Sequence, residues 1–261
     1  MAIYFKTILF SGLLSLMCTT KVSEWVLLNT APEEYLLVYH YNREISDPIR
    51  AANKTVSNQI SNANIRFQEV KNDNLIQPYY ALYYNKRVVK KYSSPSELAN
   101  LSVSPVRERI AKEIMGGKLC VMVYLTTGND ARDDKGRKTI LKSIDSSPFR
   151  SIITFVELSR KSIEESHFVS MLLNVEDDLN TINEPMLFGI FGRFKALEPL
   201  LAGGISEENI GHMINFLTAD CSCLIKDDLP GTDILFTNSW ENPVPALVNN
   251  ILDENPSLMH R

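Results

Sequence analysis

The 261-residue chain contains only 11 glycines, four histidines and four cysteines, and these low counts narrow its chemistry. It has no Gly-x-Gly-x-x-Gly and no Walker A loop, so a nucleotide-binding function has no motif. His-Glu-x-x-His and Gly-x-Ser-x-Gly are also absent, which leaves zinc-protease and serine-hydrolase functions without a motif. Basic residues are not in excess. The formal net charge of −4 argues against a nucleic-acid partner, because such partners call for a clustered basic face.

The composition is that of an ordinary globular chain. Hydrophobic residues make up 44% of the sequence and charged residues 22%, both close to the average for soluble proteins. A chain of this length can bury a proper core without disulfides, as one large domain or two small ones.

The N-terminus has the pattern of an export signal. Lys6 supplies a positive charge, and the uncharged, mostly apolar residues 7–17 have the length of a signal-peptide core but are short for a bilayer span. We therefore predict a signal peptide or membrane-targeting segment over residues 1–20. It is cleaved after Thr20, retained as an anchor, or acylated at Cys18, although Met17 stands where a lipobox requires a small residue. The alternative, a buried first strand or helix, fits Lys6 poorly.

This segment implies an extracytoplasmic location, in the periplasm, in the cell envelope or as a secreted protein. Membrane association is then expected only through the N-terminal segment.

The rest of the chain divides into two halves that read alike, with a predicted boundary at Gly116-Gly117, directly after a helix over residues 105–115. Apolar and β-branched runs predict strands over residues 35–41, 64–70, 79–84 and 87–89 of the first half. A helix over 47–60 separates the first two strands, with Asp47 as its N-cap. The second half repeats this order with strands over 119–125, 151–158, 186–191 and 194–197, and helices over 133–144, 163–173 and 206–217.

In each half a proline stands directly before the third strand, as Gln77-Pro78 and Glu184-Pro185. Together with the element order, these prolines make the chain resemble two thioredoxin-like domains in tandem. The resemblance implies an α/β fold of two three-layer domains after the signal segment. Domain 1 covers residues 24–117, and domain 2 covers residues 118–261, with the likeness itself ending near residue 220. It also implies that Pro78 and Pro185 are cis and lie beside the redox site. The first half departs from the family by lacking a helix between its second strand and Pro78.

The residues that the family uses for catalysis are missing. A thioredoxin-type oxidoreductase has Cys-x-x-Cys after its first strand, where the helix N-terminus stabilises the thiolate. The equivalent residues 42–47 and 126–132 contain no cysteine. We therefore expect a non-catalytic binding or scaffold protein without a cofactor, whose partner is a protein or peptide.

The remaining cysteines leave one alternative function open. Cys120 lies in an apolar strand and is expected to be an inert core thiol. Cys221 and Cys223, in a C-terminal Cys-Ser-Cys extension, could form a disulfide together, or one of them could pair with Cys120. They could also exchange disulfides, which would make the protein an enzyme, or bind a soft metal with His212, although this spacing matches no standard zinc pattern.

Overall fold

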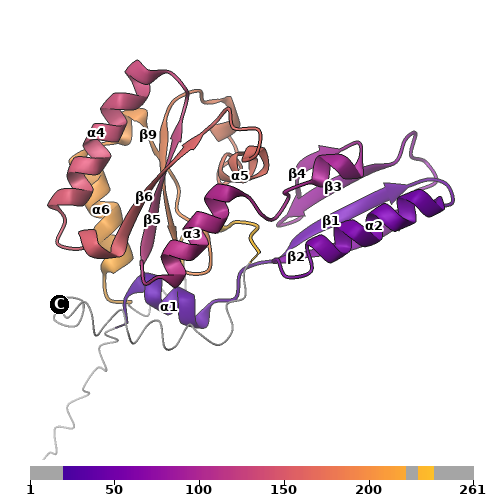
Figure 1. Ribbon diagram of the computed structural model, residues 1–261, viewed down its shortest axis with the longest axis horizontal. Helices are drawn as coiled ribbons and strands as arrows, with labels where there is room; N and C mark the ends of the chain where they lie inside the picture. Colours follow the sequence, from indigo (N-terminus) through magenta and orange to yellow (C-terminus); the bar gives the residue numbers. More distant parts are fainter. Residues whose placement is uncertain (1–19, 222–228, 238–261) are drawn as a thin grey trace, which may run out of the picture.

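The computed structural model describes residues 20–221 and 229–237, which form an α/β protein with two mixed sheets in two lobes (Figure 1). The predicted signal segment lies outside the described residues except for Thr20, and so does Cys223. In the ranges that are described, no helix is both long enough and apolar enough to span a membrane.

The first lobe is a four-stranded sheet with one helix of three turns. Strands β1 (Tyr35–Tyr41), β2 (Ile65–Lys71), β3 (Tyr79–Tyr84) and β4 (Arg87–Tyr92) lie in the order β2-β1-β3-β4. β1 is parallel to β2 and antiparallel to β3. Helix α2 (Asp47–Gln59) and the 3-10 turn η1 (Pro95–Leu98) complete the lobe. The turn between β3 and β4 has φ values of 47° and 65° at Asn85 and Lys86, the left-handed pair that a type I′ hairpin requires.

The second lobe repeats this order. Strands β6 (Ile153–Ser159), β5 (Cys120–Thr126), β7 (Met186–Phe191) and β8 (Lys195–Ala196) are neighbours in that sequence, with β10 (Thr232–Asp233) beside β8 and β9 (Leu200–Leu201) beside β7. β5 is parallel to β6 and antiparallel to β7, as β1 is to β2 and β3. The short turns η2 (Arg150–Ile152), η3 (Leu179–Thr181) and η4 (Ala202–Gly204) connect these elements.

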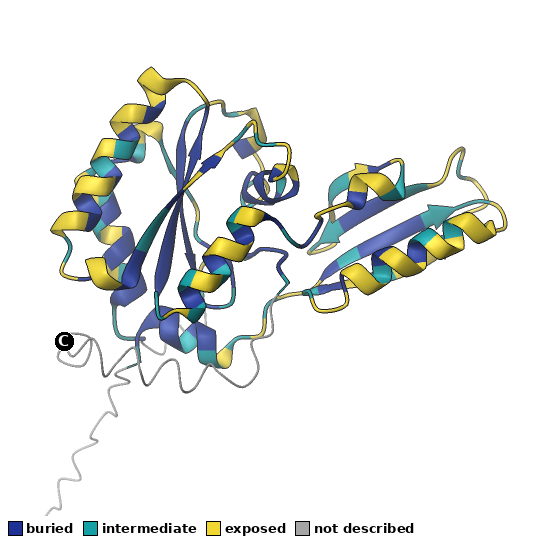
Figure 2. Ribbon diagram, viewed as in Figure 1, coloured by how far each residue is buried: buried dark blue, intermediate teal, exposed yellow. Residues whose placement is uncertain are grey.

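Helices cover both faces of the second sheet. Alternate residues of β5 enter two different cores, with Cys120, Met122 and Tyr124 in one and Val121, Val123 and Leu125 in the other. Helices α4 (Asp130–Ser146), α6 (Glu207–Thr218) and α1 (Val22–Asn29) enclose the first core. Helices α3 (Pro105–Met115) and α5 (Ser166–Leu172) enclose the second (Figure 1). The outward faces of α3, α4 and α6 are exposed, whereas the strands between the helices are buried (Figure 2).

The first lobe has only two layers within the described residues. Val56 and Ile60, from α2 and its C-terminal end, pack with Leu37 and Tyr39 on one face of the sheet. The side chains of the opposite face belong to neither core. The three-layer expectation therefore applies to the second lobe alone, because the segment between β2 and Pro78 is too short to cross the sheet as a helix.

Two helices that lie before the predicted Gly116-Gly117 boundary pack on the second lobe. Helix α3, expected in the first half, packs on β5 and β6, and α1 packs on α6 and β7. Both helices bury their apolar sides in the second lobe, so the first lobe is an insertion between α1 and α3. Helix α4 begins three residues before the predicted Asp133, and Ser46 rather than Asp47 is the N-cap of α2.

A C-terminal strap, residues 229–237, joins the two lobes. Its strand β10 pairs with β8 in the second lobe, while Thr237 forms a bridge with Ala63 in the first. The Tyr35 hydroxyl donates to the Asp233 carbonyl over 2.8 Å, and the Asp233 carboxylate lies 3.0 Å from Lys195 Nζ. These contacts position the first lobe beside the second.

Candidate functional site

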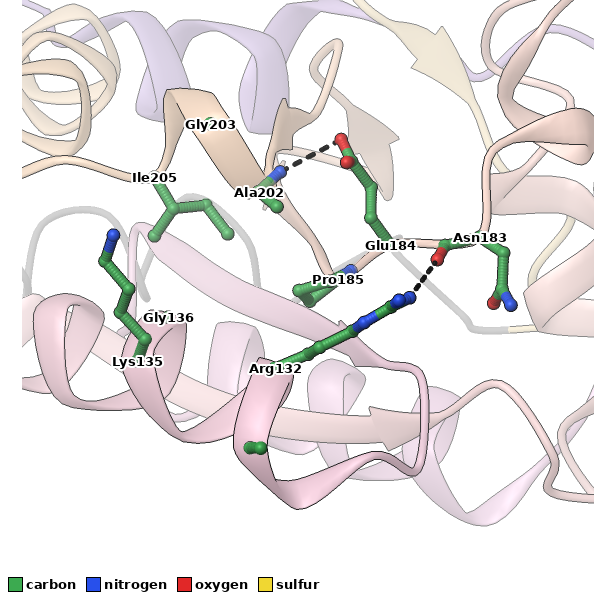
Figure 3. Close-up of a pocket in the computed structure, with 10 residues that line it drawn as sticks. Arg132, Lys135, Gly136, Asn183, Glu184, Pro185, Ala202, Gly203 and Ile205 are labelled. Carbon is green, nitrogen blue, oxygen red and sulfur yellow. Dashed lines mark hydrogen bonds between the residues drawn. The ribbon is translucent and has the colours of Figure 1, made fainter.

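A pocket of about 520 Å³ lies beside Pro185, where β5 ends and α4 begins (Figure 3). One wall is the first two turns of α4, with Arg132 and Lys135, and the other is formed by residues 183–185 and by η4. Figure 3 shows Arg132 reaching across to Asn183, and Lys135 at the opposite end beside Ile205. The pocket thus occupies the position to which the thioredoxin resemblance assigns a redox site.

The loop that precedes α4 is closed by a buried carboxylate. Asp133 Oδ1 accepts hydrogen bonds from the Thr127 backbone N–H and hydroxyl, both at 3.0 Å. Its Oδ2 accepts from the backbone N–H groups of Gly128 and Asn129, at 2.9 and 3.1 Å. Asn129 caps α4 by accepting from the Arg132 N–H. The N–H groups that could stabilise a thiolate or another anion at this turn are therefore already engaged by the protein's own side chain.

Arg160 fixes the segment that carries Pro185. Its guanidinium donates to the carbonyls of Ile182 and Glu184 over 2.6 and 3.1 Å. Burial lowers the pKa of Arg160, and the nearby carboxylates of Asp133 and Glu184 oppose this effect. Because one cation spans two carbonyls on either side of Asn183, the pocket wall is held in one geometry.

The charge balance of this pocket is positive. Arg132 and Lys135 are exposed at its rim, and Arg132 makes a long contact of 3.4 Å with the Asn183 carbonyl. Glu184 is the acidic residue in the lining, and its Oε1 already accepts from the Ala202 N–H at 3.2 Å. The two cations are thus available to an acidic group on a ligand.

A second pocket, of about 370 Å³, lies in the equivalent place of the first lobe, beside Pro78. It is lined by the end of β1 and the start of α2, including Tyr41, Arg43 and Ile45, together with the exposed Ile76. Asn42 fixes the opposite wall by donating to the Leu75 carbonyl over 2.6 Å. Both lobes therefore present a cavity between the β–α turn and the proline.

Pro78 and Pro185 are both trans, because the described residues contain no cis peptide bond. The resemblance had implied cis prolines at these positions, and that expectation is wrong. The resemblance places this proline beside a redox site, and this chain has no cysteine at that position in either lobe.

The two described cysteines, Cys120 and Cys221, line neither pocket. Cys120 is a free thiol in the core of the second lobe, and burial raises its pKa far above the ordinary value. Within residues 20–221 and 229–237, Cys120 forms no disulfide, so it is not paired with Cys221. Cys221 is also buried, at the end of the same core, and its N–H donates to the Thr20 carbonyl over 2.8 Å. Cys223, its predicted partner, is outside the described residues.

His212 is exposed on α6, where it lies 3.8 Å from Glu208. The structure does not place it in the core that holds Cys221. Among the residues that are described, no three histidine, cysteine or acidic side chains are grouped as metal ligands.

Sequence reasoning missed Asp133 and Arg160, the two residues that shape the Pro185 pocket. The sequence indicated a helix start near Asp133, a position where an acidic residue is common and carries no sign of a buried role. Arg160 is one of two adjacent basic residues after a strand, Arg160 and Lys161, and only the fold brings residues 182–184 to it.

A search of protein-family models finds none that matches this chain, and no curated protein sequence matches it.

Proposed function

We propose that this chain is a non-catalytic binding protein of two thioredoxin-like domains that works outside the cytoplasm. The repeated strand order, with a parallel first pair and an antiparallel third strand, supports the domain assignment. The apolar segment after Lys6 supports the location.

The observation that carries the proposal is the Asp133 loop. At the turn where a thioredoxin-type enzyme holds its attacking thiolate, this chain has a carboxylate that occupies three backbone N–H groups. A carboxylate cannot attack a disulfide as a thiolate does. A substrate anion could bind these N–H groups only if the hydrogen bonds to Asp133 were broken first. What remains at the site is a shaped pocket, which suits recognition.

The ligand class follows from the pocket lining. Arg132 and Lys135 favour an acidic side chain, and a volume of about 520 Å³ accommodates one or two residues of an extended peptide. We expect acidic peptides to bind more tightly than their lysine-substituted counterparts.

Binding is tested with immobilised acidic peptides and the full chain carrying Arg132→Ala with Lys135→Ala. Affinity should fall about tenfold, since two exposed charges contribute about 0.5–1 kcal/mol each. Lys138→Ala is the matched control, because Lys138 is an exposed cation of the same helix and does not line the pocket. Equal losses in both variants would contradict a ligand at this site.

Catalysis is tested by reduction of insulin disulfides. The chain should not exceed the uncatalysed rate. Activity that disappears in a Cys221→Ser, Cys223→Ser double variant would replace the proposal with the alternative thiol–disulfide function.

A further inference from the structure

A further cavity, of about 410 Å³, lies between the two lobes, and we call it the interlobe cavity. The first lobe contributes the β3–β4 hairpin, with Arg87 and Val88. The second lobe contributes the end of α5 and the residues that follow it, with Met171 and Asp177. Figure 1 shows β4 and α5 on the facing sides of the two lobes. Interfaces between domains are preferred places for ligand sites.

The strap fixes one wall of the interlobe cavity. The rings of Tyr35 and Tyr84 line this wall and stack with centroids 4.6 Å apart. The Tyr84 hydroxyl donates to Glu33 Oε2 over 2.6 Å and accepts from the Asp233 N–H over 3.2 Å. The Tyr35 hydroxyl donates to the Asp233 carbonyl. Because these bonds connect β1 and β3 to β10, the wall has one geometry.

An ion pair between the lobes lines the same cavity. Arg87 Nη1 lies 2.6 Å from Asp177 Oδ1, and the two side chains are 75% and 83% exposed. An ion pair so exposed contributes little to stability, because water solvates each charge nearly as well. Either group can therefore exchange its partner for a charged group of a ligand at little cost.

Apolar side chains lie beside this ion pair. Val88 is 45% exposed, and it is one of four large apolar residues that are exposed in the described part of the chain. Val89 and Val175 are half-buried and also line the cavity. An apolar ligand group that covers these valines removes their surface from water, which is favourable. The interlobe cavity thus offers a cation, an anion and an apolar wall.

The spacing of the two charges selects the class of ligand. Arg87 and Asp177 touch directly, so a ligand that pairs with both must carry a negative and a positive group close together. An α-amino acid has this arrangement, because its carboxylate and its ammonium are attached to one carbon. A guanidinium binds a carboxylate through two parallel hydrogen bonds, and an aspartate accepts from an ammonium. A peptide carries its two terminal charges on different residues and fits this pair less well.

We propose that the interlobe cavity binds a free α-amino acid with an apolar side chain. Its carboxylate pairs with Arg87, its ammonium pairs with Asp177, and its side chain contacts Val88 and Val175. The site goes beyond the peptide recognition proposed for the Pro185 pocket, with which it shares no lining residue.

Isothermal titration calorimetry of the full chain tests the proposal with L-valine, L-leucine and L-methionine as probes. At least one of them should bind saturably, with one molecule per chain. For leucine, the two charges are then removed in turn by titrating L-leucinamide, which lacks the carboxylate, and 4-methylpentanoate, which lacks the ammonium. Each analogue should bind about tenfold more weakly than leucine, because it loses one charge-assisted pair.

Two variants remove the charges from the protein instead. Arg87→Gln and Asp177→Asn should each weaken binding about tenfold. The matched controls are Lys86→Gln and Asp178→Asn, because these exposed neighbours carry the same charges and do not line the cavity. Both controls should bind as the wild type does. All four variants should unfold at nearly the same urea concentration, since none of the four side chains is buried.

Three results would overturn the proposal. The first is the absence of binding heat with all three amino acids. The second is an equal loss of affinity in the cavity variants and in their controls. The third is a loss of amino-acid binding in the Arg132→Ala, Lys135→Ala variant, because it would assign the ligand to the Pro185 pocket. That last variant also separates the two proposals, since it should lose acidic peptides and keep the amino acid.

Discussion

Replacing Asp133 with asparagine removes the charge from the loop before α4 while keeping the shape of the side chain. The carboxylate accepts four hydrogen bonds, two on each oxygen. Asparagine has one acceptor oxygen, and its NH₂ group cannot accept. If the NH₂ faces Gly128 and Asn129, both backbone N–H groups lose their acceptor; if it faces Thr127, the Thr127 N–H loses its acceptor, while the Thr127 hydroxyl can rotate and accept from the NH₂.

The size of the effect follows from which pair is lost. A hydrogen bond to a charged group contributes about 1.5–3 kcal/mol, so two lost bonds give about 3–6 kcal/mol. Gly128 and Asn129 are exposed, and water can replace part of what their N–H groups lose. Either orientation of the amide therefore loses one or two hydrogen bonds to a charged acceptor with partial compensation, and we expect a loss of about 2–4 kcal/mol in the free energy of unfolding.

Urea denaturation followed by far-UV circular dichroism measures this loss. Asp130→Asn is the control, because Asp130 lies in the same first turn of α4, is exposed and loses the same charge. Its effect should stay below about 1 kcal/mol, the range of a charge interacting with the helix dipole. If both variants unfold at the same urea concentration, the carboxylate does not hold the loop, and the central support for a non-catalytic site fails.

Three further changes test the fold around the sites by the same denaturation assay. Gly136→Ala should destabilise the protein by about 1–3 kcal/mol, because the new methyl would lie 2.9 Å from Cζ of the buried Tyr124. Gly211→Ala, in open space on α6, should instead stabilise the protein. Equal effects of the two substitutions would contradict this packing. Burial lowers the pKa of His167 to about 4, so the unfolded chain takes up a proton first as the pH falls from 6.5 to 4. Stability should decrease by about 2–3 kcal/mol across that range, and a His167→Gln variant that kept the same slope would refute the assignment. Arg107→Lys should lower the free energy of unfolding by about 3 kcal/mol, because lysine has three donors for the five hydrogen bonds that the buried guanidinium makes. A loss below about 1 kcal/mol would show that water replaces the missing hydrogen bonds.

Most secondary structure could be predicted from the sequence, because it depends on local patterns. The strands Tyr35–Tyr41, Tyr79–Tyr84 and Met186–Phe191 and the helix Pro105–Met115 have the predicted bounds. Continuous apolar runs mark buried strands, and a proline at the start with glycine after the end marks the helix. Helix α1 was not predicted. Its N-cap Lys21 and its residue Glu24 are charged, so the sequence does not indicate that this segment is buried against α6.

The sequence by itself determined that no cysteine stands at the β–α turns and that two similar runs of elements follow each other, since both are properties of residue order. Only the tertiary structure decided that α3 belongs to the second lobe, because apolar helix faces do not state which sheet will bury them. It also decided the roles of Asp133 and Arg160. Each is an ordinary charged residue until the fold buries Asp133, partly buries Arg160 and brings to both the backbone groups that they bind.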